Sequence, residues 1–338
     1  MAISDYRSFG RTGVKVSPLV LGTMMFGGRT DLETSVRIID RAIDAGINFI
    51  DTANVYSRGT AEEVTGEALK RNGKRGHVFL ATKVHLPMHD TDPNLRGSSR
   101  RHIIAQAEAS LKRLSTDYVD LYQIHRPEPD TAIDETLRAL DDLVRSGKVR
   151  YIGSSTFAGW QLVESLWAAK ELGLNRFVSE QPPYNLLDRR IERELLPAAQ
   201  TFGLGVIPWS PLGGGLLTGK YKRGEPLPAD SRYAVNANRP QARRLTDRVY
   251  DVIEPLTLLA AEKGLPLSQL ATAWAIQAPG VTAPIIGPRT EDQFEDALKA
   301  AETTLTKEDL ARIDEIIPPG THVSPFYEAR FGASLYRW

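Results

Sequence analysis

Residues 49–69 read FIDTANVYSRGTAEEVTGEAL, in which a short apolar run ends at Asp51, a loop contains Tyr56, and a segment of helical character follows. The same order of a buried strand and an amphipathic helix recurs along the chain. Eight apolar runs predict strands, at residues 18–24, 48–53, 77–84, 118–125, 150–156, 176–181, 205–210 and 283–287. Because these runs are apolar on both faces, they predict an α/β fold with a parallel sheet that closes into a barrel.

Three parts of the chain fall outside this alternation. Residues 6–17 predict an N-terminal hairpin, and residues 213–243 form a long insert after the seventh strand. Beyond Leu305, a capping box of Thr306 and Asp309 predicts a further helix. We expect the aromatic tail either to pack on the barrel or to wall a pocket; its members are Phe326, Tyr327, Phe331, Tyr336 and Trp338. Since no repeat or linker divides the pattern, residues 1–338 are predicted to form a single domain.

Composition excludes several classes of function. The 338 residues include 42 Lys and Arg and 42 Asp and Glu, so the net charge of zero predicts neither a nucleic-acid nor a membrane partner. The chain has no cysteine, which excludes disulfides and a cysteine nucleophile. Its six histidines form no recognisable ligand pattern, and we predict no metal site. Without a signal-peptide pattern or a membrane-spanning apolar run, we expect a cytoplasmic protein.

Four ionisable residues lie at or just beyond the ends of three successive predicted strands. They are Asp51, Tyr56, Lys83 and His125. Barrel enzymes carry their catalytic residues at the C-terminal ends of the strands, so we predict that these side chains converge on one rim. Considered singly, Asp51 and Lys83 could form a structural ion pair and His125 could be a hydrogen-bonded core histidine. Their shared position favours catalysis.

The chemistry of the four side chains is complementary. A phenol, with a pKa near 10, donates its proton poorly at neutral pH, but an adjacent ammonium favours the ionised form. We therefore predict that Lys83 assists Tyr56 as an acid and that Asp51 keeps Lys83 charged. His125 can donate a hydrogen bond to a carbonyl oxygen and orient it. None of the four can deliver two electrons, so a reduction would require a cofactor.

Longer motifs resemble the aldo-keto reductases over essentially the full chain. They are LGTMMFG, FIDTANVYSRGTAEEVTGEAL, ATKV, DYVDLYQIHRP, LRALDDLVRSGKVRYIGSS, EQPPYNLLDR, WSPLGGGLLTGKY and PIIGPRTEDQFEDAL, in the family's order and spacing. The resemblance implies a (β/α)8 TIM barrel that uses NADPH to reduce an aldehyde or ketone, a small-molecule carbonyl substrate. It implies that Tyr56 is the proton donor, that Lys83 and Asp51 tune it, and that His125 orients the carbonyl. Some superfamily members are cytoplasmic channel subunits, so a redox-responsive binding module with little turnover is the alternative.

The resemblance also implies a set of cofactor-binding positions. Around the nicotinamide they are Gly22, Thr23, Ser155, Gln181 and Trp209; around the pyrophosphate they are Ser210, Leu212, Gly213, Gly215, Lys220 and Arg232; and after the eighth strand they are Gly287, Arg289, Gln293 and Asp296. Arg289 would meet the 2′-phosphate, which favours NADPH over NADH. Gln293 also fits a capping box with Thr290. Thr156 and Asp296 depart from the asparagines that the family usually carries.

Overall fold

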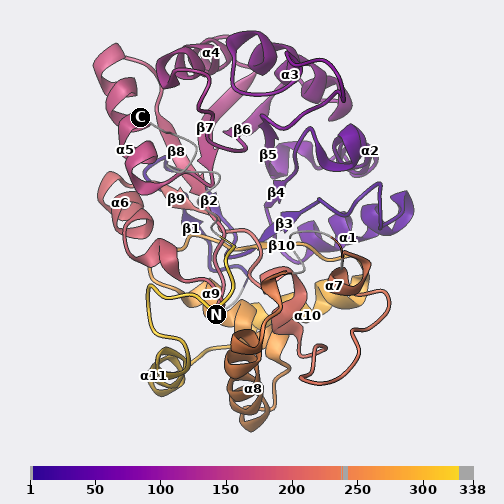
Figure 1. Cartoon of the computed structure of the whole chain (residues 1–338). Coiled ribbons are helices and arrows are strands. Elements are labelled where there is room, and N and C mark those ends of the chain that lie inside the picture. The colour runs from indigo at the N-terminus through magenta and orange to yellow at the C-terminus, as the bar shows by residue number, and fades with distance from the viewer. Residues whose placement is uncertain (1–2, 237, 239–242, 327–338) are drawn as a thin grey trace.

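The computed structural model describes residues 3–236, 238 and 243–326. Eight parallel strands form one sheet in the order β10-β3-β4-β5-β6-β7-β8-β9. Their bounds are β3 (Val20–Gly22), β4 (Phe49–Asp51), β5 (Phe79–Val84), β6 (Val119–Ile124), β7 (Val149–Ser155), β8 (Phe177–Gln181), β9 (Gly205–Val206) and β10 (Ile285–Ile286). The strands curl around a common centre and the helices lie outside them (Figure 1). The predicted (β/α)8 barrel is confirmed.

Backbone hydrogen bonds join the first and last strands of this order. Thr282 N donates to Val206 O at 2.8 Å, and Ile285 N donates to Pro208 O at 2.8 Å. These bonds connect the β9 segment to the β10 segment. The sheet therefore closes on itself, as a barrel requires.

Strands β9 and β10 are shorter than the apolar runs that predict them. Each run contains a proline, Pro208 in the first and Pro284 in the second, and proline has no N–H to donate to a neighbouring strand. Pairing nevertheless continues beyond β9, because Trp209 N donates to Pro182 O at 2.9 Å. The backbone thus follows the predicted path after the regular ladder ends.

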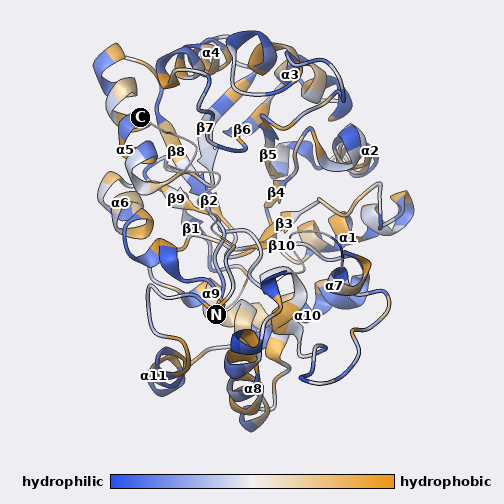
Figure 2. Cartoon of the chain, in the orientation of Figure 1, coloured by the Kyte–Doolittle hydropathy of each residue, from blue (hydrophilic) through white to orange (hydrophobic). Residues whose placement is uncertain are grey.

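Helices cover the outside of the sheet. They are α1 (Leu32–Asp44), α2 (Thr60–Asn72), α3 (Arg100–Arg113), α4 (Ile133–Arg145), α5 (Gly159–Leu172), α6 (Leu195–Phe202), α9 (Leu267–Gln277) and α10 (Glu291–Glu302). Figure 2 shows hydrophobic residues along the strands and hydrophilic residues on the outer helix surfaces. In α4, for example, Leu137 and Leu140 are buried on one face, as their spacing of three residues predicts. Among the helices in the described ranges, none is long and apolar enough to cross a membrane.

The predicted N-terminal hairpin is confirmed as β1 (Arg7–Ser8) and β2 (Lys15–Val16), which pair antiparallel. Its Phe9 ring packs against Phe49 and Phe79 in strands β4 and β5, with ring centroids 5.6 and 5.2 Å apart. Both phenylalanines are the first residues of their strands. The hairpin therefore closes the N-terminal end of the barrel, and the C-terminal ends of the strands form the open end.

The remaining segments follow β9 in the chain. The insert contains the 3-10 turn η4 (Gly213–Thr218) and α7 (Arg232–Val235), and α8 (Asp247–Glu262) follows it. The predicted capping box of Thr306 and Asp309 is confirmed at the start of α11 (Lys307–Ile316). Phe326 is buried, and the other tail aromatics, Tyr327, Phe331, Tyr336 and Trp338, lie outside the described residues.

Candidate active site

The four predicted catalytic residues lie together at the open end of the barrel. Asp51 is the last residue of β4, Lys83 is the next to last of β5, and His125 directly follows β6. Tyr56 begins η1 (Tyr56–Gly59), the short turn after β4. Because β4, β5 and β6 are neighbours in the sheet, their ends meet at one rim (Figure 1).

Lys83 lies at the centre of this group and is fully buried. Its Nζ donates to Asp51 Oδ2 at 2.5 Å, to Thr52 O at 2.8 Å and to Tyr56 OH at 3.3 Å. Burial by itself would lower the pKa of Lys83, but Asp51 and Tyr56 act in the opposite direction and hold it above its ordinary value. Lys83 is therefore an ammonium ion beside the phenol.

Two glutamines hold the other oxygen of Asp51. Gln123 Nε2 donates to Asp51 Oδ1 at 3.1 Å and Gln181 Nε2 donates to the same oxygen at 2.9 Å. Gln181 Nε2 also donates to Gln123 Oε1 at 3.1 Å. This network fixes the carboxylate so that Oδ2 meets Lys83. Sequence reasoning missed Gln123, although its position two residues before His125 places both side chains on the same side of the predicted strand at residues 118–125.

His125 lies beside the phenol of Tyr56. The two ring centroids are 5.8 Å apart and the ring planes are inclined by 82°. Burial, followed by the positive charges of Arg126 and Lys83, holds the pKa of His125 well below its ordinary value. The imidazole is therefore neutral near pH 7 and carries one N–H that can donate a hydrogen bond.

The turn after Tyr56 has an unusual backbone. Ser57 and Arg58 have φ angles of 47° and 54°, and Gly59 follows with 101°. Positive φ is uncommon for residues other than glycine and is found where the surrounding structure enforces it. Ser57 Oγ donates to Phe26 O at 3.3 Å, which ties the turn to the loop after β3. The turn thereby sets the position of the phenol at the rim.

Several predicted nicotinamide positions gather at the ends of β7, β8 and β9. Ser155 Oγ donates to Gln181 O at 2.9 Å, and Trp209 Nε1 donates to Thr156 Oγ1 at 3.4 Å. Thr156 has a φ of 62°, a costly conformation for a β-branched residue. Thr23, next to the end of β3, has a buried Oγ1 atom without a hydrogen-bond partner in the described part of the chain. A bound ligand would satisfy such a group.

Glu180 is a buried acid that sequence reasoning missed. It precedes Gln181 in β8 and accepts hydrogen bonds from Ser154 Oγ at 2.5 Å and from Phe157 N at 3.1 Å. Burial raises the pKa of Glu180 to about 7. Its signal in the sequence is a carboxylate inside a predicted strand that contains Phe177 and Val178. Glu180 fixes the loop that carries Thr156.

The predicted pyrophosphate loop has a backbone that only glycine adopts without strain. Gly213, Gly214 and Gly215 have φ angles of 55°, 64° and 100°. A Cβ atom at Gly215 would lie 3.5 Å from Lys220 Nζ, and one at Gly214 would lie 3.6 Å from Arg232 Nη1. Both cations therefore lie against the loop, as expected for residues that would contact a phosphate. Ser210 and Leu212 directly precede this loop, and Leu212 is its N-terminal flanking residue.

Arg289 follows β10 at the start of α10. Its backbone N donates to Gln293 Oε1 at 2.9 Å, and Gln293 N donates to Thr290 Oγ1 at 3.3 Å. Thr290 caps the helix as predicted, whereas the Gln293 side chain accepts from Arg289 N instead of from Thr290 N, so the predicted capping box forms only in part. Gly287 lies just before these residues, and a Cβ atom there would meet nothing within 4 Å. This end of the candidate cofactor site is open.

Two predicted cofactor positions have structural partners of their own. A Cβ atom at Gly22 would lie 2.6 Å from Ile285 Cγ2, so a glycine is required for β3 to approach β10. Asp296 accepts hydrogen bonds from Ser268 Oγ and Gln269 Nε2, both at 2.7 Å, and joins α10 to α9. These contacts explain both residue types through packing, and the cofactor contacts predicted for them stay predictions.

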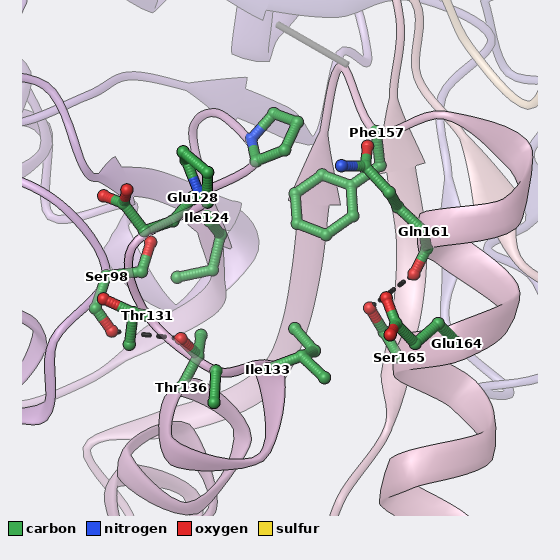
Figure 3. A pocket seen from close by; sticks show the side chains of 13 residues that line it. Ser98, Ile124, Glu128, Thr131, Ile133, Thr136, Phe157, Gln161, Glu164 and Ser165 are labelled. Carbon is green, nitrogen blue, oxygen red and sulfur yellow. Dashed lines mark hydrogen bonds between the residues drawn. The ribbon is translucent and has the colours of Figure 1, made fainter. Parts of the chain in front are cut away.

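A separate cavity of about 170 Å³ lies between the loop after β6, the start of α4 and the first turns of α5 (Figure 3). Ile133 and Phe157 line it with apolar atoms. Some polar groups of its wall are paired with each other, since Thr136 Oγ1 donates to Ser98 O at 3.0 Å and Ser165 Oγ donates to Gln161 O at 2.7 Å. The four predicted catalytic residues do not line this cavity.

Comparison with known proteins agrees with this arrangement. The model of the Aldo/keto reductase family matches residues 18–318. The uncharacterized oxidoreductase YrpG of Bacillus subtilis is 44% identical over 96% of this chain and 99% of its own. A probable voltage-gated potassium channel subunit beta of Oryza sativa subsp. japonica is 38% identical over 93% and 96%, and versiconal hemiacetal acetate reductase of Aspergillus parasiticus is 33% identical over 94% and 98%. The predicted resemblance is confirmed, and the chain is an oxidoreductase that belongs to the aldo/keto reductase family.

Proposed function

We propose that this chain reduces an aldehyde or ketone to the alcohol with NADPH and that Tyr56 donates the proton. The observation that carries the proposal is the hydrogen-bonded series from Asp51 through Lys83 to Tyr56. Lys83 is buried and charged, whereas Tyr56 lies half-buried at the rim, where a substrate oxygen can reach it. The series therefore supports proton donation to that oxygen, because the nearby ammonium stabilises the phenolate left behind.

His125 supplies the second contact to the substrate. Its neutral ring can donate one hydrogen bond to the carbonyl oxygen, and it lies beside the Tyr56 ring. Two donors, one in the turn after β4 and one just after β6, then meet the same oxygen and hold the carbonyl in one orientation. Since the imidazole stays neutral, it does not compete with Tyr56 as the proton donor.

The residues at the open end fit NADPH. The unpartnered Thr23 Oγ1 lies at the nicotinamide end, and the glycine loop with Lys220 and Arg232 lies at the phosphate end. Arg289 adds a further cation beyond them. When bound, NADPH supplies the hydride that these side chains cannot provide. The additional phosphate of NADPH suits a site with several cations, because charge-assisted hydrogen bonds are the strong ones.

Replacing Tyr56 by Phe tests the proposal, because it keeps the ring and removes the hydroxyl. We expect turnover of a panel of aldehydes and ketones, followed by NADPH absorbance, to fall by roughly 10² to 10⁴. NADPH binding should be nearly unchanged. Tyr118→Phe is the matched control, since Tyr118 stacks on Arg75 and Arg150 at the other end of the barrel. Substantial residual turnover in Tyr56→Phe would refute the role of the phenol.

The second candidate function is a redox-responsive module that binds the cofactor with little turnover. It is favoured by the relatives named as probable voltage-gated potassium channel subunits beta in Oryza sativa and Arabidopsis thaliana, each 38% identical over 93% of this chain. The same carbonyl panel separates the two functions. Steady turnover of the wild-type protein favours the enzyme, whereas tight retention of NADPH without turnover favours the module.

A further inference from the structure

Arg29 lies in the loop between β3 and α1, just after the motif LGTMMFG. It is not one of the predicted catalytic or cofactor-binding residues. The loop is joined to the segment after β10, because Thr30 Oγ1 donates to Arg289 O at 3.0 Å. Arg29 is exposed and forms no ion pair with a carboxylate of the described chain. Arg37 and Arg41 on α1 differ in this respect, since each pairs with a glutamate of α10 at 2.8 and 2.7 Å. The charge of Arg29 is therefore left without a counter-ion beside the Arg289 segment.

Three more cations converge on the same region without a carboxylate partner among the described residues. Burial is the main cause of the lowered pKa of Arg232, and the charges of Arg29 and Arg289 lower it further. Burial also lowers the pKa of Lys220, followed by the charge of Arg289, while Asp230 acts in the opposite direction. Like charges gathered in this way repel one another, and a bound anion would offset the repulsion.

The four cations fall into two pairs by the segments to which they belong, while the charges of Arg29 and Arg289 also reach Arg232. Lys220 and Arg232 lie against the glycine loop, as the distances to Gly215 and Gly214 show. Arg29 and Arg289 belong to the two loops that the Thr30 hydrogen bond joins, at the start of α10. NADPH likewise carries its anions in two places, the diphosphate and the 2′-phosphate. A ligand with two separate anionic groups could therefore contact cations of both pairs.

We propose that Arg29 is a specificity-determining residue that pairs with the 2′-phosphate of the dinucleotide together with Arg289. This inference rests on the proposed function, because it requires a nicotinamide dinucleotide at the open end of the barrel. Arginine suits the task, since its planar guanidinium can donate two parallel hydrogen bonds to a phosphate. A glutamine at this position would keep a polar side chain but remove the guanidinium and its charge.

The test compares Arg29→Gln with Arg37→Gln, which removes the same charge from an arginine that already has a carboxylate partner. Affinities of the full chain are measured by calorimetric titration for NADPH, NADH, adenosine 2′,5′-bisphosphate and 5′-AMP. We expect Arg29→Gln to weaken NADPH and the bisphosphate by roughly 10-fold and to leave NADH and 5′-AMP nearly unchanged. The NADPH affinity should also depend less on salt. Arg37→Gln should leave the affinities for all four ligands nearly unchanged.

Several outcomes would overturn the inference. If Arg29→Gln lost equal affinity for NADPH and NADH, Arg29 would contact the diphosphate or stabilise the fold. If its affinity for NADPH were unchanged, Arg29 would not contact the 2′-phosphate. Thermal melting and circular dichroism of each variant separate lost binding from lost folding. A wild-type chain that binds neither dinucleotide defeats the proposed function itself. Tight wild-type binding of NADPH that Arg29→Gln does not alter defeats only the role of Arg29.

Discussion

Replacing Glu180 by Gln measures what a buried carboxyl does to the stability of the barrel. Glu180 has no exposed surface. Burial raises its pKa from the ordinary 4.5 to about 7, while Ser154, the backbone of Phe157 and the charge of Arg126 act in the opposite direction. Between these two pH values the folded chain therefore holds a proton that the unfolded chain has released.

The sign of the pH dependence follows from this proton. The free energy of unfolding falls with rising pH wherever the folded state binds more protons than the unfolded state. The contribution of protonated Glu180 is therefore complete below about pH 4.5 and lost as the pH rises through about 7. A pKa that moves from 4.5 to about 7 corresponds to roughly 3 kcal/mol, at about 1.36 kcal/mol for each pH unit.

Urea denaturation followed by circular dichroism at pH 4.5, 6 and 8 gives the comparison. Other titrating groups act in both proteins, so they cancel in the difference between Glu180→Gln and the wild type. We expect that difference to shift by about 3 kcal/mol in favour of the variant between pH 4.5 and 8. Glu171→Gln, at an exposed glutamate on α5, should show no such shift. A Glu180→Gln difference that stays constant with pH would refute the reasoning.

Two further substitutions test the loop after β7 and the packing of α2 on α3. Thr156→Asn should raise the unfolding free energy by about 1 kcal/mol, because asparagine tolerates the φ of 62° better than threonine does. Thr156→Val is the control, because valine is β-branched like threonine. If the melting temperature were unchanged in both variants, the argument from the backbone angle would be wrong. Arg113→Ala should lower the unfolding free energy by about 3–5 kcal/mol, because it leaves the fully buried Glu62 without its 2.6 Å ion pair. A loss no larger than that of Arg71→Ala, at an exposed pair with Glu67, would show that Arg113 contributes little.

The barrel could be predicted because each strand is a separate apolar run with a helix after it. The hairpin and the capping box at Thr306 were predicted from equally local sequence patterns, and the structure confirms both. Strand ends were harder to place. At Pro208 and Pro284 the apolar pattern continues while the regular hydrogen-bond ladder is interrupted, because the pattern reports burial and the ladder requires N–H donors.

The candidate site was predictable only in part, for a related reason. Asp51 and His125 end apolar runs, and the ends of parallel strands meet, so their proximity follows from local patterns. Gln123 and Glu180 lie inside strands, and their partners become known only when the sheet register is known. Arg29 depends on the meeting of two loops whose residues are separated by about 260 positions in sequence. Local periodicity carries no information about such a contact.

The two ends of the site are positioned by different parts of the fold. Asp51, Lys83, Gln123 and Gln181 all belong to strands, and a shift of one residue in register would turn any of them away from the barrel interior. Hydrogen bonds of about 3 Å between them therefore follow from the sheet itself, and proton transfer demands geometry of that accuracy. The cations lie outside the strands instead, in loops and at the start of α7, and a side-chain bond from Thr30 joins the segments of Arg29 and Arg289. Attraction between charges falls slowly with distance, so a phosphate contact would tolerate the looser geometry of these segments better than the strand residues that position Tyr56.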